Sequence, residues 1–414
     1  MEQKVLVVED SRAFRRIIEL ELRKAGFTPV LTESIAEAEK VLDEGTDFLC
    51  AILDYCLPDG QDGEIIDLCL SVNIKVIVLT ALMDEMTREK VLAKTVIDYI
   101  PKDSPACISS IIPILHRLEN NKLHKVLVVD DSATARRYLR SLLERQYLTV
   151  VEAANGEQAL AMIQQEPDIS LVITDYAMPE RDGVSLIKEL RKTYRTGQLA
   201  AIGLSASDEP ALTAKFLKAG ANDYLKKPFN QEEFYCRLHS TLDILDSERR
   251  LYRLANQDYL TQSWNRRYFF EHALVRHHQG PRCLALLDID HFKAINDSFG
   301  HHIGDMVLID LAQRLKRFFS DALVARFGGE EFCLLFGNSP QIFERRLAAL
   351  MEDVADAELE LMGHTVRYSV SLGMVNAEAN IHELIRRADH CLYQAKSSGR
   401  NRIVLEHPQA VPSL

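Results

Sequence analysis

The sequence lacks the long apolar runs that would place the chain in a membrane. None reaches the ~18 residues that span a bilayer, so we expect no membrane insertion. The opening residues 1–10 lack the basic start and long apolar core of a signal peptide. The eight cysteines are scattered and form no CxxC pair. Reduced thiols in the cytoplasm fit this pattern better than disulfides or a zinc site.

An excess of basic residues is also missing. Lys and Arg number 49 against 61 Asp and Glu, which gives a formal net charge of -12. This balance argues against DNA, RNA or an anionic membrane as the main partner. Nucleotides remain possible ligands, because Mg²⁺ can offset their charge locally. At 414 residues, the chain has room for about two to four domains.

What the sequence does contain is an internal repeat. The segment KVLVVED at 4–10 reappears as KVLVVDD at 125–131, an offset of 121 residues. Asp54 and Asp175 keep this offset, and a small insertion separates the later matches. A repeat of about 120 residues is a normal domain length. We therefore expect two similar domains, at 1–120 and 121–240.

Short apolar runs alternate with helical stretches in both copies, which predicts an α/β fold. The runs are apolar throughout, which is typical of parallel strands buried on both faces. Such sheets gather their functional residues at the carboxyl ends of the strands. The expected strands are 4–8, 28–31, 49–53, 75–79 and 96–100, then 125–129, 149–152, 169–174, 200–204 and 222–225.

Acidic residues follow several of these strands, and this arrangement has a chemical logic. Converging carboxylates repel one another unless a cation lies between them, and oxygen ligands suit Mg²⁺. A carboxylate held beside Mg²⁺ can attack a phosphoryl group, while a hydroxyl and a lysine hold the new oxygens. The first copy offers Glu9, Asp10, Asp54, Thr80 and Lys102, and the second offers Asp130, Asp131, Asp175, Ser205 and Lys227.

With these residues, both copies resemble the receiver domains of two-component response regulators. The resemblance implies flavodoxin-like doubly wound domains, phosphorylated at Asp54 and Asp175 by a sensor histidine kinase or phosphotransfer protein. It also implies that Thr80, Lys102, Ser205 and Lys227 act in the switch. Lys227 precedes Pro228, as is usual, whereas Lys102 precedes Asp103, so the family's cis peptide is doubtful in copy one. One copy, which the residues do not identify, is alternatively a dimerising adaptor.

A polar, charged helical stretch follows at about 231–256, and we expect a linker at 241–257. Its leucines resemble a short connecting helix that pairs with a partner's copy. The alternative is a plain surface helix on the second repeat. The leucines concerned are Leu238, Leu242, Leu245, Leu251 and Leu254.

The third domain, expected at 258–414, carries another acidic site. A strand ends at Asp288, and strands at 323–327 and 331–336 flank the turn Gly328-Gly329. Two glycines at a hairpin tip permit positive φ and close approach to a ligand. The approach of Asp288 to Glu330 would make a two-carboxylate metal site for a triphosphate. Backbone amides near Phe292 and Lys293 would suit phosphate oxygens.

These residues, with RFGGEEF at 326–332, resemble the GGDEF family of diguanylate cyclases over about 258–405. The resemblance implies a ferredoxin-like α/β fold and the condensation of two GTP into cyclic di-GMP and pyrophosphate. It assigns Mg²⁺ or Mn²⁺ to Asp288, the Ile289 carbonyl and Glu330. Glu330 would also assist deprotonation of the attacking hydroxyl. The remaining implied residues are Glu331 for metal, Asn296 and Asp305 for guanine, and Phe292, Lys293, Lys396 and Arg400 for phosphates.

Two departures from that family stand out. Gln262-Ser263-Trp264 replaces the usual Gly-Leu pair and alters packing rather than chemistry. The family's product-inhibition motif, Arg-x-x-Asp, is also absent, because Phe319 to Ala322 occupy its positions. Without the arginine, bidentate recognition of product is lost. We therefore expect weak or no feedback through that site.

The order of the three domains resembles PleD-type response regulators, in which two cyclase domains must face each other. The resemblance implies a homodimer when active, formed after phosphorylation through a population shift. The rival hypotheses are a non-catalytic GTP- or cyclic di-GMP-binding scaffold and a cyclase of a mixed purine product. Asp305 disfavours the second, because adenine lacks the donor pair that a carboxylate accepts. A transcription factor is disfavoured, since no basic DNA-reading helix follows the repeats.

Overall fold

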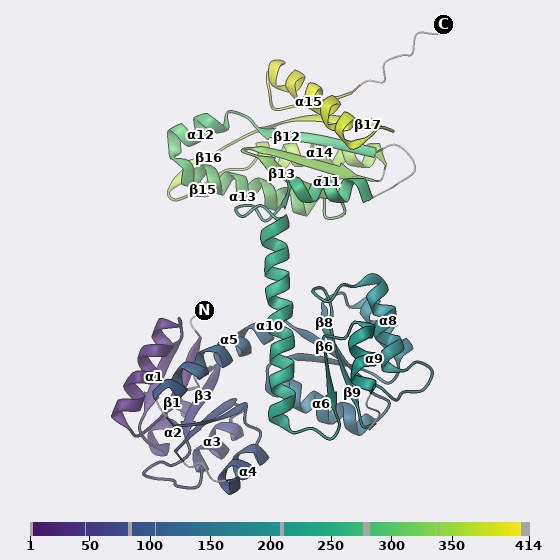
Figure 1. Ribbon diagram of the computed structural model, residues 1–414. Coiled ribbons are helices and arrows are strands. Elements are labelled where there is room, and N and C mark those ends of the chain that lie inside the picture. The colour runs from purple at the N-terminus through teal and green to yellow at the C-terminus, as the bar shows by residue number, and fades with distance from the viewer. Residues whose placement is uncertain are drawn as a thin grey trace. The chain divides into compact units, whose positions relative to one another are not determined.

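The computed structural model describes residues 3–45, 47–81, 85–103, 105–207, 211–275, 282–337 and 339–406. The outermost parts of the expected domains, 1–2 and 407–414, lie outside these ranges. The chain divides into two compact units, Met1–Arg249 and Arg250–Leu414. The first runs from purple to teal and the second from green to yellow (Figure 1). None of the described helices is long and apolar enough to cross a membrane.

The first repeat, receiver 1, is a parallel sheet of strand order β2-β1-β3-β4-β5. Val5 and Val7 on β1 pack toward α1 and α5, and Leu6 and Val8 pack toward α2, α3 and α4. Both faces are therefore buried, as the apolar runs predicted. The elements are β1 (Lys4–Val8), α1 (Arg12–Lys24), β2 (Thr28–Thr32), α2 (Ile35–Asp43), β3 (Cys50–Asp54), α3 (Glu64–Ser71), β4 (Val76–Thr80), α4 (Glu85–Ala93), β5 (Asp98–Pro101), the 3₁₀ helix η1 (Pro105–Ser110) and α5 (Ile111–Asn121).

The second repeat, receiver 2, has the equivalent parallel sheet, of order β10-β9-β8-β6-β7. The flavodoxin-like, doubly wound fold predicted for both repeats is confirmed. The elements are β6 (Lys125–Val129), α6 (Ala133–Arg145), β7 (Thr149–Ala153), α7 (Gly156–Gln165), β8 (Ile169–Asp175), α8 (Gly183–Thr193), β9 (Ala200–Ser205), α9 (Leu212–Ala219), β10 (Asp223–Lys226) and α10 (Gln231–Asn256).

Helix α10 serves as the last helix of receiver 2 and continues beyond it. Leu238, Leu242 and Leu245 are buried in the receiver 2 core, so these three do not form the pairing face expected of them. That core therefore extends past residue 240, where the receiver was expected to end. Leu251 and Leu254 are exposed, at 64% and 68%. Of the five leucines, only these two are free to contact a partner.

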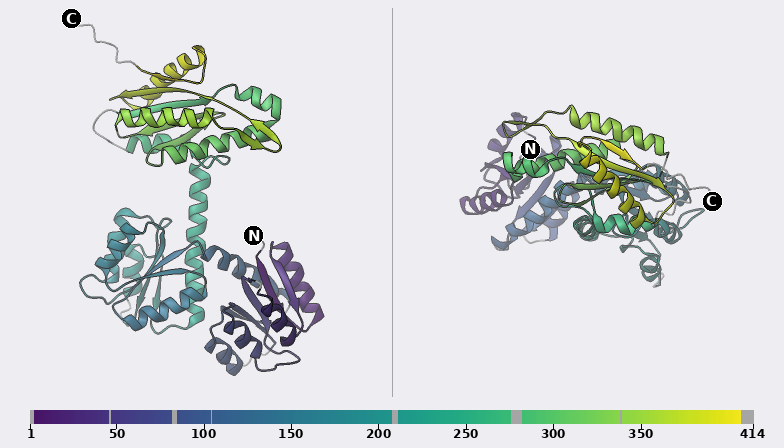
Figure 2. Two further views of the ribbon diagram at one scale, coloured as in Figure 1. Left: turned by 180° about the vertical axis from the view of Figure 1, so that it is seen from behind. Right: turned by 90° about the horizontal axis from the view of Figure 1, so that it is seen from above.

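The C-terminal unit is built on a mixed six-stranded sheet of order β11-β13-β14-β12-β17-β18. One face packs against α12, α13 and α14, and the other against α11 and α15 (Figure 2). This agrees with the predicted ferredoxin-like domain. The elements are β11 (Trp264–Asn265), α11 (Arg266–Val275), β12 (Arg282–Ile289), α12 (Phe292–Phe299), α13 (His301–Phe318), β13 (Leu323–Gly328), β14 (Glu331–Phe336), α14 (Pro340–Ala355), β15 (Leu359–Leu361), β16 (His364–Val366), β17 (Val370–Ala377), α15 (Ile381–Ser397) and β18 (Ile403–Leu405).

Candidate functional site

The receiver 1 residues meet at the carboxyl end of the sheet. Lys102 Nζ lies 2.5 Å from Asp54 Oδ2 and 2.7 Å from Glu9 Oε2. Burial works against the charged ammonium, but the hydrogen bonds and charges of the two carboxylates raise the pKa of Lys102. Thr80 is fully buried at the end of the neighbouring strand, and its carbonyl accepts from the Lys102 amide at 2.7 Å. The structure thus brings the predicted residues of this copy together.

Receiver 2 repeats this arrangement. Lys227 Nζ lies 2.8 Å from Asp130 Oδ2 and 2.5 Å from Asp175 Oδ1. Desolvation opposes its charge, but the hydrogen bonds that Lys227 donates to both carboxylates, together with their charges, raise the pKa of Lys227. The Ser205 carbonyl accepts from the Lys227 amide at 2.7 Å. Within the described ranges, the Lys227–Pro228 bond is the one cis peptide, whereas Lys102 is followed by Asp103 in trans.

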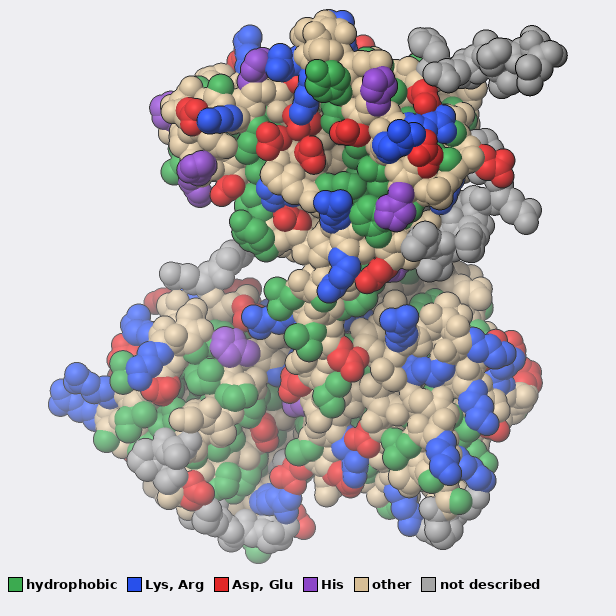
Figure 3. Space-filling view, turned by 45° about the horizontal axis from the view of Figure 1, so that its top comes forward, with side chains coloured by type: hydrophobic (Ala, Val, Ile, Leu, Met, Phe, Trp, Pro, Cys, Tyr) green, Lys and Arg blue, Asp and Glu red, His purple; other side chains and the backbone are tan. Residues whose placement is uncertain are grey.

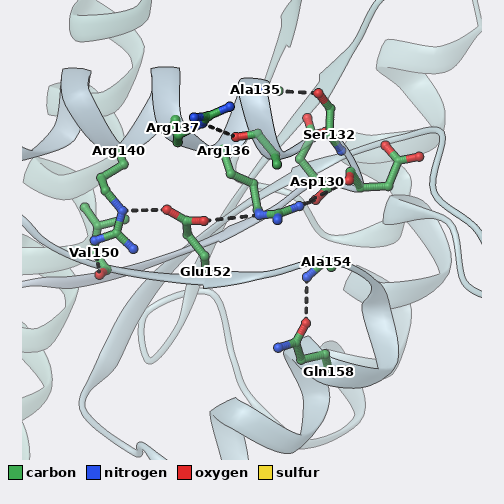
Figure 4. Close-up of polar contacts among 12 residues, drawn as sticks. Asp130, Ser132, Ala135, Arg136, Arg137, Arg140, Val150, Glu152, Ala154 and Gln158 are labelled. Carbon is green, nitrogen blue, oxygen red and sulfur yellow. Dashed lines mark hydrogen bonds and ion pairs between the residues drawn. The ribbon is translucent and has the colours of Figure 1, made fainter.

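The two receivers differ in how closely their acids converge. One carboxylate oxygen each from Glu9, Asp10 and Asp54 lies within 4.8 Å of the other two. Among the described residues, no other set of three Asp, Glu, His or Cys side chains comes this close together. An all-oxygen donor set suits Mg²⁺. The surrounding contacts are otherwise alike. The Asp130 carbonyl accepts from Arg136 at 2.7 Å in receiver 2 (Figure 4), as the Glu9 carbonyl accepts from Arg15 at 2.6 Å in receiver 1.

The hairpin between β13 and β14 is held by Arg326. Its guanidinium donates to the Gly329 carbonyl at 2.9 and 2.6 Å and to Asp258 Oδ1 at 2.9 Å. Burial opposes the charge of Asp258, but hydrogen bonds from Thr261 and the Arg326 guanidinium lower its pKa. Gly328 and Gly329 both have positive φ, of 152° and 50°, as predicted for the tip. The tip is therefore fixed before any ligand binds.

Asp288 lies at the centre of the site. The β12–β14 register places it opposite Glu331, and Glu330 precedes Glu331 at the hairpin tip. Asp288 is 5% exposed, and Lys396 Nζ lies 2.8 Å from its Oδ2. Burial raises the pKa of Asp288; Lys396 opposes this, and the charges of Glu330 and Glu331 add to it. A cation would relieve this repulsion, so the donor set fits Mg²⁺ or Mn²⁺.

The predicted guanine residues come from two neighbouring helices. Asn296 lies on α12 and Asp305 on α13, and both side chains are half-buried. Gly304 permits this approach, because a Cβ at 304 would overlap Asn296 Oδ1 and crowd Phe292. Lys293 is exposed at the start of α12, where free amides point outward. The space-filling view shows acidic side chains gathered on one face of this unit (Figure 3).

Sequence reasoning missed Asp290. This carboxylate is 4% exposed and accepts from Ser369 Oγ at 2.7 Å, Ser371 Oγ at 2.6 Å and the Asn401 amide at 3.0 Å. It thereby fixes the loop that carries Arg400 to the end of β12. A second acid two residues after Asp288 was the available signal, because alternate residues share one face of a strand. Asp258 and Arg326 were also given no role.

The residues at the positions of the absent inhibitory motif make structural contacts within the domain. Phe319 is 1% exposed and packs against Phe343, with ring centroids 5.6 Å apart. Asp321 forms an ion pair with Arg346 at 2.6 Å. At the position that the resemblance assigns to the arginine of that motif, this chain therefore has a core phenylalanine.

Fold and site together define two receiver domains followed by a nucleotide-cyclase-type domain. The response regulator receiver model matches residues 5–110 and 126–239, more than half of the chain. The GGDEF diguanylate cyclase model matches residues 255–402. The chain therefore belongs to the response regulators, and it is of the PleD type, with two receivers and a C-terminal GGDEF domain.

Parts of the chain match named relatives and a solved structure. The chain is 30% identical over 299 residues to the response regulator PleD of Caulobacter vibrioides, covering 68% of this chain and 65% of PleD. It is 37% identical over 177 residues to the diguanylate cyclase DgcM of Escherichia coli, which is 41% of this chain and 43% of DgcM. A solved structure of a probable two-component response regulator/GGDEF protein matches with 40% identity and TM-score 0.54, covering 59% of this chain and all of that one.

Proposed function

We propose that the chain is a phosphorylation-controlled diguanylate cyclase that joins two GTP into cyclic di-GMP and releases pyrophosphate. The observation that carries the proposal is the environment of Asp288. This carboxylate pairs with Lys396, and its burial and the negative charges of Glu330 and Glu331 raise its pKa. Such crowding is expected where a divalent cation and a triphosphate bind. The relatives named diguanylate cyclases support the same reaction class.

Each residue then has a distinct task. Asp288, Glu330 and the Ile289 carbonyl would hold Mg²⁺ or Mn²⁺, which supplies Lewis-acid stabilisation of phosphate charge when bound. Glu330 accepts the proton of the attacking 3′-hydroxyl, and Glu331 shares in metal binding. Lys293, Lys396 and Arg400, with the amides at 292–293, hold the phosphates.

Asn296 and Asp305 give the site its preference for guanine. A carboxylate accepts from guanine N1–H and the exocyclic amine, and adenine offers no matching pair of donors. A site built around such bonds rejects the analogue that leaves its polar groups unpaired. With ATP and GTP supplied together, chromatography should show cyclic di-GMP alone. A mixed dinucleotide as the main product would favour the rival cyclase.

Control is proposed to come from the receivers. A phosphoryl group on Asp54 or Asp175 adds about -1.5 to -2 charges beside Lys102 or Lys227 and repositions Thr80 or Ser205. The altered receivers pair with those of a second copy, and two cyclase domains then meet with their nucleotides aligned. A sensor histidine kinase or phosphotransfer protein would supply the phosphoryl group.

The decisive experiment is pyrophosphate release from GTP and Mg²⁺, with and without an acyl-phosphate donor. Wild type should turn over, whereas Glu330→Gln should lose about a hundredfold or more of its rate, as expected of a general base and metal ligand. Asp356→Asn, an exposed carboxylate outside the site, is the matched control and should keep full activity. If wild type binds GTP without releasing pyrophosphate, the chain is a signalling scaffold.

Product feedback gives a second check. Because Phe319 is buried, we expect cyclic di-GMP at low micromolar concentration to leave the rate unchanged. Strong inhibition that disappears in Asp321→Ala would show that the segment 319–322 still binds product.

A further inference from the structure

A pocket of about 340 Å³ lies between the two receivers, and neither Asp54 nor Asp175 is among its lining residues. Receiver 1 contributes the turn between α3 and β4, and receiver 2 contributes one face of α6. This volume is at the lower end of the range for small-molecule sites. The lining residues used below are Lys75, Arg137, Arg140, Glu144 and Arg145.

The pocket carries an excess of positive charge. Of these five ionisable side chains, four are cations and one is a carboxylate. Arg140 is already paired, with Glu144 at 3.1 Å and with Glu152 at 2.5 Å. Lys75, Arg137 and Arg145 form no ion pair with any carboxylate in the described ranges. Burial, and next the charge of Arg145, lower the pKa of Lys75.

The walls of the pocket are fixed by contacts that cross between the receivers. Tyr147, two residues beyond Arg145, donates its hydroxyl to the Leu49 carbonyl at 2.6 Å and packs on the receiver 1 core. Asn121 donates to the Gln146 carbonyl at 2.8 Å, and Gln146 donates to the Ile97 carbonyl at 3.4 Å. The cations from both receivers are therefore held close together, which favours an anion.

A chain of ion pairs connects this pocket to the receiver 2 site (Figure 4). Arg140 Nε donates to Glu152, Arg136 donates to the other oxygen of Glu152 at 3.1 Å, and Arg136 also binds the Asp130 carbonyl. Receiver 1 lacks this chain. Leu31 and Glu19 occupy the positions that correspond to Glu152 and Arg140.

We infer that this pocket binds a small phosphate anion, inorganic or nucleotide, and that its occupancy alters the reactivity of Asp175. A phosphate group offers several acceptor oxygens to Lys75, Arg137 and Arg145, which have no carboxylate partner among the described residues. Recruitment of Arg140 toward the anion weakens its hold on Glu152. Arg136 and the Asp130 loop respond, because they share that carboxylate. This site is independent of the proposed cyclase activity.

The test is calorimetric titration of the full chain, in Mg²⁺-free buffer, with orthophosphate, pyrophosphate and cyclic di-GMP in separate runs. We expect one site per chain for at least one probe, with affinity that weakens with added salt. Arg137→Ala/Arg145→Ala should weaken binding about tenfold or more. Binding of the inorganic probes alone identifies an inorganic anion, and binding of cyclic di-GMP alone identifies a nucleotide.

The repeat supplies a matched control. Arg16 and Lys24 occupy the corresponding positions of α1, so Arg16→Ala/Lys24→Ala should bind as wild type does. Lys75→Ala checks the receiver 1 side of the pocket. Lys75 Nζ also lies 5.7 Å from the centroid of the Tyr147 ring, so thermal unfolding of this variant is measured alongside its anion binding. Absence of binding by every probe, or equal binding by wild type and the α6 double variant, would overturn the site.

Coupling to Asp175 needs its own measurement. In an Asp54→Asn background, the rate of phosphorylation by acetyl phosphate should change about fivefold when the anion saturates the pocket. Glu152→Gln should keep anion binding and lose this change, because it weakens the link between Arg140 and Arg136. A rate that ignores the anion in the Asp54→Asn protein would refute the coupling.

Discussion

The two receivers share one chemistry, but they embed it in different surroundings. In both, a lysine bridges the proposed phosphoacceptor and an acid that directly follows the first strand. The side chain of Lys102 is 7% exposed, whereas that of Lys227 is 24% exposed. Only receiver 1 gathers three acids within metal-binding reach among the described residues. Matching motifs therefore do not imply matching reactivity.

A second difference lies at the end of the first helix of each repeat. Receiver 1 has Gly26 at φ 88°, and receiver 2 has Tyr147 at φ 61° in the corresponding position. A left-handed conformation costs a residue with a Cβ roughly 1–2 kcal/mol. Tyr147 adopts this conformation despite its cost, and its ring packs against the core of receiver 1. The repeat has thus diverged to join its two copies.

The largest expected effect concerns phosphorylation at limiting Mg²⁺. Asp54→Asn should remove nearly all phosphate incorporated from acetyl phosphate, because the preformed acid cluster of receiver 1 recruits the cation first. Asp175→Asn should leave most of it. Intact-protein mass spectrometry across a Mg²⁺ series measures the phosphate incorporated by each variant. Equal loss of phosphate in the two variants at low Mg²⁺ would show that receiver 1 does not bind the cation more readily than receiver 2.

Next in size is the effect of removing the joining side chain. Tyr147→Ala loses ring packing and the bond to Leu49, and should cost about 2 kcal/mol of receiver stability. Tyr147→Phe loses only the hydroxyl and should cost about 1 kcal/mol. Urea denaturation of the full chain, followed in the receiver transition, measures each. An unchanged midpoint for Tyr147→Ala would mean that the ring does not join the receivers.

The glycine partner of that position should give a smaller change. Gly26→Ala introduces a Cβ at φ 88°, with no neighbouring atom within 4 Å, so backbone strain alone remains. We expect a loss of about 1 kcal/mol, measured in the same urea titration. A neutral or stabilised protein would contradict the strain assigned to the left-handed position in both repeats.

The smallest effect at neutral pH comes from His239 on α10, where receiver 1 has Ile114. Burial, helped by the Arg117 charge and opposed by Asp243, lowers the pKa of His239 to about 4. The unfolded chain binds this proton near pH 6.5, so stability is complete above 6.5 and declines as pH falls toward 4. Between pH 7 and 5, the melting temperature should fall less steeply with decreasing pH in His239→Gln than in wild type. An identical pH dependence in the two proteins would show that His239 does not contribute to the loss of stability at low pH.

Periodicity and turn chemistry located most of the fold in advance. All ten receiver strands lie within two residues of the expected runs, and α10 spans the expected 231–256. These features depend on local patterns of apolar residues, which the sequence displays directly. The acid–lysine clusters were also predictable, since parallel strands bring their carboxyl ends to one edge.

Contacts between distant segments were not predictable. Nothing local distinguishes Leu245, buried in receiver 2, from Leu251, exposed six residues later. The Tyr147 ring points toward receiver 1 because its backbone is left-handed, a conformation that residues with a Cβ rarely adopt. Asp290 accepts its hydrogen bonds from Ser369 and Ser371, about 80 residues away, and no local pattern shows these partners. Tertiary packing decides each of these positions.

The burial of Phe319 bears on how this protein can change over evolution. An arginine placed there would put a charge inside the aromatic core formed with Phe343, and would destabilise the folded state. Product feedback at this position would therefore also require changes in the core around Phe319. Tighter control is therefore more readily gained elsewhere in the chain, where a single exposed residue can change without disturbing a packed core.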